Sequence, residues 1–123
     1  MEKGKIYNIQ ERTFEFSCRI LRLYRYMLNQ SQTNDVFCRQ LVRAGTSIGA
    51  NLEEATAAQS RADFISKCNI ALKEARETHY WLRLFRETEM LPVSCIENLN
   101  EESNEILSVL TAIVKNTRIN SKT

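Results

Sequence analysis

LVRAGTSIGANLEEATAAQSRADFISKCNIALKEARETHYWLRLFRETE, residues 41–89, is the stretch that decides the fold. Near its start, apolar residues recur every three or four positions and so line one side of a helix; they are Leu41, Ala44, Ile48, Leu52 and Ala55. A polar row lies next to this apolar stripe, because each of its residues directly precedes one of the apolar residues. It consists of Arg43, Ser47, Asn51 and Glu54. The sequence therefore predicts a helix with an apolar stripe and a polar stripe side by side.

The composition of the whole chain favours long helices. Its 123 residues are enough for about one domain with a hydrophobic core. Three glycines and one proline leave few positions for turns, so we expect helices with short connections rather than many strands. We predict a single all-α domain, an antiparallel up-down-up-down four-helix bundle, with a loose lead-in over residues 1–10 and helices at about 12–30, 35–58, 61–89 and 95–118.

Heptad spacing predicts which side of each helix is buried. The third helix has the row Phe64, Cys68, Ala71, Ala75, Thr78, Leu82 and Phe85. The fourth has Ile96, Leu99, Ser103, Ile106, Leu110, Ile113 and Thr117. The first has two adjacent rows, which predict a wide buried face: Phe14, Ser17, Leu21, Tyr24 and Leu28 in one, and Phe16, Ile20, Leu23 and Met27 in the other.

Two glycines one turn apart, Gly45 and Gly49, lie inside the second predicted helix. Each costs a helix about 1 kcal/mol relative to alanine, so we expect another helix backbone to approach closely there. A tight turn near residues 58–60 would place Ala71 and Ala75 of the third helix opposite them.

Helix starts are marked by capping residues. Ser60 with Asp63 approximates a capping box before the third helix, and Ser94 with Glu97 repeats it after Pro92, which blocks helix continuation. In the polar break at residues 31–34, Thr33 or Asn34 can cap the second helix.

Residues suited to catalysis or metal binding are few. His79 is the only histidine, and it lacks the Glu-x-x-His spacing of di-iron bundles. Glu53 and Glu54 point about 100° apart on a helix, which makes them a poor acid–base pair. Cysteines 18, 38, 68 and 95 form no CxxC pair and are expected to be reduced, buried thiols. We therefore expect a non-enzyme without metal or cofactor.

The charge balance and hydropathy set wider limits. The chain has 17 basic and 15 acidic residues, a net charge of +2, which does not indicate a strongly cationic nucleic-acid binder. No signal peptide and no run of roughly 18 apolar residues is present, so we expect a soluble, cytoplasmic protein.

The basic residues fall into two groups, according to whether their own helix supplies a carboxylate three or four positions away. The pairs with such a carboxylate are Glu15–Arg19, Asp35–Arg39, Asp63–Lys67, Lys73–Glu77 and Arg83–Glu87. The arginines without one are Arg22, Arg25, Arg43 and Arg76, and these are the candidate nucleic-acid-binding residues.

Aromatic rings accompany these cations. Arg22 shares a helix face with Arg19 and Tyr26, and Arg76 shares one with Lys73, Tyr80 and Arg83. Such faces suit a nucleic-acid backbone, with charges for phosphates and rings for stacking. The alternative is a solvated face or cross-helix ion pairs, such as Arg43 with Glu74 or Glu77.

A subunit interface or a polar network is the favoured role for Ser47, Asn51, Glu54 and Trp81. Asn51 and Glu54 would destabilise an interior unless fully hydrogen-bonded, which argues against burial in the core. Trp81 and Leu84 are offset from the heptad row and form a second apolar strip, which favours self-association.

The runs RAGTSIGANLEEA (43–55) and QSRADFISKCNIALKEARETHYWLRL (59–84) resemble the 23S rRNA-intervening sequence protein family. The matching residues are Arg43, Ser47, Ile48, Asn51, Glu54, Ser60, Asp63, Phe64, Ala71, Ala75 and Glu77. The resemblance implies an antiparallel four-helix bundle, often a homopentamer, with no known enzymatic activity. The fold is also similar to the accessory variability determinant of diversity-generating retroelements, a basic pentamer that binds nucleic acid and a reverse transcriptase.

Two functions remain open from the sequence. One is a homo-oligomer, a pentamer by the resemblance, that binds RNA or DNA through arginines repeated around a ring. The other is a protein-interaction scaffold in which the same arginines pair with carboxylates across helices or subunits. A ligand-binding bundle ranks third because no cofactor residues are evident.

Overall fold

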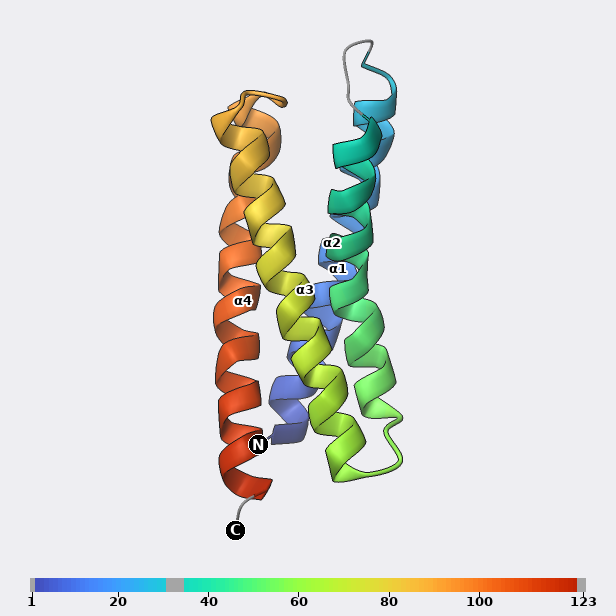
Figure 1. The fold of residues 1–123 in the computed structure, drawn as a ribbon, viewed down its shortest axis with the longest axis vertical. Helices are drawn as coiled ribbons and strands as arrows, with labels where there is room; N and C mark the ends of the chain where they lie inside the picture. Colours follow the sequence, from blue (N-terminus) through green and yellow to red (C-terminus); the bar gives the residue numbers. More distant parts are fainter. Residues whose placement is uncertain (1, 31–34, 122–123) are drawn as a thin grey trace.

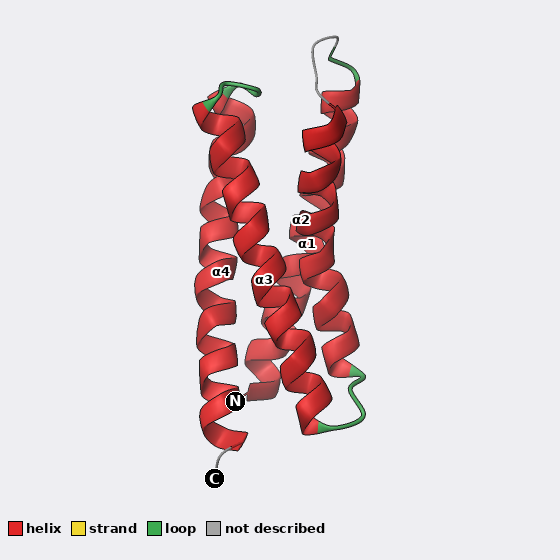
Figure 2. Ribbon diagram, viewed as in Figure 1, coloured by secondary structure: helices red, strands yellow, loops and turns green. Residues whose placement is uncertain are grey.

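The structure of the chain, a computed structural model, describes residues 2–30 and 35–121 and consists there of four α-helices (Figure 1). They are α1 (Glu2–Leu28), α2 (Asp35–Thr56), α3 (Arg61–Glu87) and α4 (Val93–Ser121). Consecutive helices run in opposite directions, and short loops join α2 to α3 and α3 to α4 (Figure 2). The predicted all-α, up-down-up-down bundle is confirmed.

The bundle has four sides. Each helix packs on its neighbours in the chain, and α4 also packs on α1. Over the described residues the backbones of α1 and α3 do not approach each other closely, and neither do those of α2 and α4. The helices therefore occupy the corners of a square, with α1 and α3 on one diagonal. No helix in the described ranges is long and apolar enough to span a bilayer.

The predicted heptad rows of α2, α3 and α4 form the core. The five apolar positions predicted for α2 are buried, as is the whole α4 row from Ile96 to Thr117. In α3 the row is buried from Cys68 to Phe85, and Phe64 is partly buried. The buried hydroxyls of Thr78 and Thr117 donate to backbone carbonyls one turn earlier at 2.7 Å, so both are hydrogen-bonded.

The first helix begins earlier than its sequence pattern predicts. α1 starts at Glu2, so the prediction of a loose lead-in with a helix from about Arg12 is wrong for residues 2–10. Ile9 is 2% exposed and lies one heptad before the buried Phe16. It faces Val109 and Ile113 of α4, and this packing supports the additional turns, because short helices depend on tertiary contacts.

One of the two α1 rows is buried, and the other is largely in water. Phe16, Ile20, Leu23 and Met27 are core residues, as predicted. Phe14, Leu21 and Leu28 are 54%, 52% and 55% exposed, so the prediction that both rows face the core is wrong. We call Phe14, Leu21 and Leu28 the outer row.

The two glycines of α2 face α1 rather than α3. A Cβ at Gly49 would lie 3.3 Å from the backbone oxygen of Thr13, and one at Gly45 would lie 3.0 Å from Ile20 Cγ1. The expected close approach of a helix backbone is therefore present at Gly49. The predicted partner is wrong, because the glycines meet α1, whereas Ala71 and Ala75 are buried elsewhere in the core.

Capping is confirmed for α3 but not for α4. The Ser60 hydroxyl accepts a hydrogen bond from the Asp63 backbone N–H at 3.0 Å. α4 begins at Val93, directly after Pro92, so Ser94 lies inside the helix and the second predicted capping box is wrong. The proposed caps Thr33 and Asn34 lie outside the described residues.

The C-terminus of α3 closes with a Schellman motif. The Met90 N–H donates to the Phe85 carbonyl at 3.0 Å, and the Glu89 N–H donates to the Arg86 carbonyl at 3.2 Å. Glu89 has φ 57°, in the left-handed region that favours glycine. The motif satisfies the last carbonyls and turns the chain toward α4.

Candidate interaction surfaces

An ion-pair network centred on Arg43 crosses the α2/α3 side of the bundle. Arg43 Nη1 lies 3.2 Å from Glu74 Oε2, and Nη2 pairs with Glu77 Oε2. The Glu77 hydrogen bond is the largest cause that raises the pKa of Arg43. We call Arg43, Glu74 and Glu77 the Arg43 network. Cross-helix pairing, which was the alternative to phosphate binding at Arg43, is what the structure shows.

Glu77 connects this network to an indole. Trp81 Nε1 donates to Glu77 Oε2 at 3.0 Å. That bond, followed by the Arg43 pair, lowers the pKa of Glu77, although partial burial opposes the shift. Glu77 is therefore ionised at neutral pH. Because two carboxylates share one guanidinium, the Arg43 network carries one net negative charge.

Three aromatic rings lie together beside the Arg43 network. The Phe37 ring of α2 is 6.0 Å from the Trp81 ring, and the Tyr80 ring is 5.4 Å from Trp81 in an edge-on arrangement. Phe37 and Tyr80 are 40% and 55% exposed. Exposed aromatic residues next to arginine are typical of protein interfaces. We call these three residues the aromatic cluster; the sequence pattern indicated Trp81 but not Phe37.

The rest of the predicted polar stripe bonds within its own helix. The Ser47 hydroxyl donates to the Arg43 carbonyl, and Asn51 Nδ2 donates to the Ser47 carbonyl at 2.8 Å. Glu54 is exposed. Over the described residues, Arg43 is thus the member of the stripe whose side chain bonds to another helix.

The four candidate arginines do not form one patch on the single chain. Arg22 and Arg25 are exposed on α1, whereas Arg76 is exposed on α3 at the diagonal corner. None of these three makes an ion pair with another described residue. Arg43 differs because its charge is already paired across the α2/α3 side.

A shallow groove on the α4/α1 side brings Arg22 together with other polar groups. Its volume is about 330 Å³. The lining residues are Arg19, Arg22, Leu23 and Tyr26 from α1, and Ser94, Cys95, Asn98 and Leu99 from α4. The predicted shared face of Arg19, Arg22 and Tyr26 is therefore present, and the packing of α4 adds a hydroxyl and an amide that the sequence pattern did not indicate.

Most of the predicted pairs within helices are not formed. Asp35 and Arg39 pair at 2.8 Å. The other four predicted pairs are beyond ion-pair distance in the described part of the chain, so those predictions are wrong. Exposed pairs of this kind contribute little, because holding two long side chains in one geometry costs conformational entropy.

The sequence pattern missed a bidentate ion pair between α1 and α4. Arg12 binds Glu102 of α4 in a bidentate manner, with Nε and Nη2 each 2.7 Å from a carboxylate oxygen. Glu105 lies 3.3 Å from the same guanidinium. The pattern offered no signal for it, because the partners are 90 residues apart in sequence.

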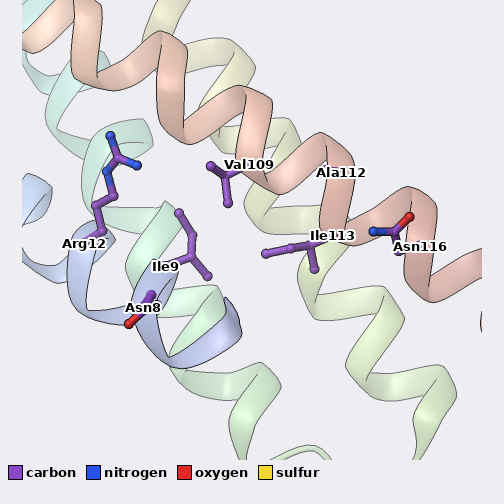
Figure 3. A pocket seen from close by; sticks show the side chains of 7 residues that line it. All are labelled: Asn8, Ile9, Arg12, Val109, Ala112, Ile113 and Asn116. Atoms are coloured by element: carbon purple, nitrogen blue, oxygen red, sulfur yellow. The ribbon is translucent and has the colours of Figure 1, made fainter. Parts of the chain in front are cut away.

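Beside Arg12 lies a pocket of about 310 Å³ between α1 and α4. Figure 3 shows Ile9, Val109 and Ile113 around it, with Arg12 at one edge. Asn8 and Asn116 are the amides among its lining residues. The described lining is mainly apolar, and these seven residues include no nucleophile and no acid–base pair.

Burial shifts the pKa values of two titratable side chains of α3, His79 and Cys68. Burial, followed by Arg83 and Arg86, lowers the pKa of His79, and its Nδ1 is buried without a partner in the described structure. Burial raises the pKa of the Cys68 thiol to about 11, and all four cysteines are free. No three potential metal ligands come together in residues 2–30 and 35–121.

Comparisons with known proteins give the family. The sequence profile of the 23S rRNA-intervening sequence proteins matches residues 5–112. A crystal structure of a protein of unknown function from the S23 ribosomal protein family of Bacteroides thetaiotaomicron is 47% identical, with a TM-score of 0.83 over 90% of this chain and 98% of that one. A search of curated proteins finds no match. The chain belongs to the 23S rRNA-intervening sequence protein family.

Proposed function

We propose that this protein is a non-enzymatic, cytoplasmic helical bundle that works as a homo-oligomer, a pentamer by its family resemblance. The observation that carries the proposal is the outer row: Phe14, Leu21 and Leu28 are each more than half exposed at heptad spacing. Apolar side chains repeated along one helix face favour a partner helix, because water is a poor solvent for them. Four free thiols are consistent with a reducing compartment.

Changing Leu21 to glutamate is expected to reduce the assembly to monomers. Leu21 is the centre of the outer row, and a charge there would be desolvated in any interface that covers the row. Light scattering after size exclusion would give the mass, and circular dichroism would show that the helices persist. Val93→Glu is the matched control, because Val93 is 61% exposed on α4 and should leave the mass unchanged. A wild-type protein that is monomeric at micromolar concentration would refute the proposal.

A second candidate function, nucleic-acid binding, is favoured by the groove on the α4/α1 side. Arg19 and Arg22 can each contact a phosphate there, and the half-exposed Tyr26 ring offers a face for a base. Repetition around an oligomer would multiply the modest charge of one chain. Arg76, on the diagonal helix, would then contribute a separate contact.

Charge reversal at Arg19 and Arg22 is expected to abolish RNA binding without changing the oligomer mass. Fluorescence anisotropy of labelled structured RNA and of labelled duplex DNA, at low and at physiological salt, would measure the binding. Binding that falls steeply with salt indicates several phosphate contacts. Arg61→Glu is the control, because Arg61 is exposed at the start of α3, outside the groove. A folded oligomer that binds neither probe at low salt would refute nucleic-acid binding, and the protein-interaction scaffold would remain.

A further inference from the structure

We propose that His79 makes the packing of α3 on α4 sensitive to acid: when its imidazole takes up a proton, the contact between the two helices weakens. His79 is the only histidine of the chain, and its Nδ1 is buried without a hydrogen-bond partner in the described structure. A buried polar atom without a partner costs free energy, and the cost grows when the group becomes charged. The inference concerns the fold of one copy and does not depend on self-association.

Two side-chain contacts between α3 and α4 show which way His79 faces. Arg86 Nη1 lies 3.7 Å from Glu97 Oε1. Arg118 Nη2 donates to Asn69 Oδ1 at 3.0 Å. Arg86 is seven residues after His79 and therefore lies on the same face of α3. His79 thus lies on the α3/α4 side of the bundle, between these two contacts.

Two further buried polar atoms without a partner lie near the same level of α4. They are Asn100 Oδ1 and Ser103 Oγ, and their residues are 8% and 1% exposed. The two helices are antiparallel (Figure 1), and Arg86 meets Glu97. Six residues along each helix from that pair, Ser103 is about one residue, or about 1.5 Å, from the height of His79. We call His79, Asn100 and Ser103 the polar layer, and its two α4 members are uncharged, so neither can neutralise an imidazolium.

Cations of α3 lie before and after His79 in the sequence. Burial is the largest cause that lowers the pKa of His79, followed by Arg83 one turn after it and Arg86 two turns after it. Lys73 and Arg76 precede it and are exposed. Within the described residues, Lys73, Arg76 and Arg83 make no ion pair. A proton on His79 would therefore add a charge of the same sign to this part of α3.

The carboxylates near the polar layer are engaged or lie in water. Glu97 of α4 and Glu87 of α3 both pair with Arg86, at 3.7 and 3.4 Å. Glu101 of α4 is exposed, so water and salt screen its charge. On the α2 side of α3, the charged groups belong to the Arg43 network, whose two carboxylates already hold a guanidinium. Protonated His79 would be a partly buried cation without a carboxylate of its own among the described residues.

The direction of the acid effect follows from the lowered pKa. The folded protein holds the pKa of His79 below its ordinary value of about 6.5, so the unfolded chain binds the proton more tightly. The stability that neutral His79 contributes is therefore fully present above about pH 7.5 and is lost progressively as the pH falls below about 6.5. Carboxylates titrate near pH ~4, so a loss between about pH 7.5 and 5.5 reports on His79.

Urea unfolding followed by circular dichroism, at one protein concentration and between about pH 7.5 and 5.5, tests the proposal. The wild-type midpoint is expected to fall as the pH is lowered. His79→Gln stays uncharged and should keep the same midpoint throughout, and His79→Phe replaces it if that variant fails to fold. A wild-type midpoint that does not move, or a variant that is as acid-sensitive as the wild type, would overturn the proposal.

A carboxylate placed in the polar layer tests the position of His79. Asn100→Asp keeps the shape of the side chain and is expected to raise the pKa of His79, which an NMR titration of the untagged protein reads from its single imidazole. Asn98→Asp is the matched control, because Asn98 lines the groove on the α4/α1 side and should leave that pKa unchanged. An Asn100→Asp protein with the wild-type pKa, or equal shifts in the two variants, would overturn the assignment of His79 to the α3/α4 contact.

Discussion

Replacing Phe85 with alanine is expected to lower the free energy of unfolding by about 3–5 kcal/mol. Phe85 is fully buried at the end of the α3 row and is among the largest core side chains. Truncation removes its transfer free energy and leaves a cavity that the surrounding helices can fill only in part. Urea denaturation followed by circular dichroism would measure the loss, compared at one protein concentration so that any assembly contributes equally.

The matched control at this site is Phe85→Leu. Leucine keeps much of the side-chain volume, so its cost should be less than half that of alanine. Equal costs for the two variants, or a loss below about 1 kcal/mol for alanine, would contradict the packing seen around Phe85.

Replacing Gly49 with leucine is expected to cost about 3 kcal/mol, at the upper end for overpacking. A Cβ alone would lie 3.3 Å from the Thr13 carbonyl oxygen and 3.4 Å from Ser17 Oγ, so a longer side chain must push α1 away. The sign of the change in stability is informative. Helix propensity by itself favours leucine over glycine by roughly 0.8 kcal/mol, so a loss of stability must come from the contact with α1. Thermal and urea unfolding of the variant would measure the net effect.

Ala50→Leu is the control for this prediction. Ala50 is the next residue in α2 and is exposed, so the same side chain there meets solvent and should change stability by less than about 0.5 kcal/mol. A Gly49→Leu protein that is as stable as the wild type would mean that α1 and α2 do not approach closely at this point.

The buried faces of α2, α3 and α4 could be predicted from the sequence because burial of a helix follows its own periodicity. The rows that end at Ala55, Phe85 and Thr117 are buried as predicted. The capping of α3 by Ser60 is equally local, since donor and acceptor are three residues apart. The helix ends of α2 and α3 lie within two residues of the predicted bounds for the same reason.

The candidate surfaces were less predictable, because they depend on which helix lies beside which. The sequence indicated unpaired arginines but left two roles open for Arg43, and only the α2/α3 packing brings Glu74 and Glu77 to it. The same holds for Arg12 and Glu102, which meet because α1 packs on α4.

By itself, the sequence determined an antiparallel four-helix bundle and the core face of three helices, because short-range periodicity fixes which side of a helix is apolar. Only the tertiary structure decided that Gly49 packs on α1, that α1 begins at Glu2, and that the outer row stays in water. The physical reason is that a helix with two apolar rows can bury either one. The rotation of α1 about its own axis, which the contacts with α2 and α4 set, chooses between them.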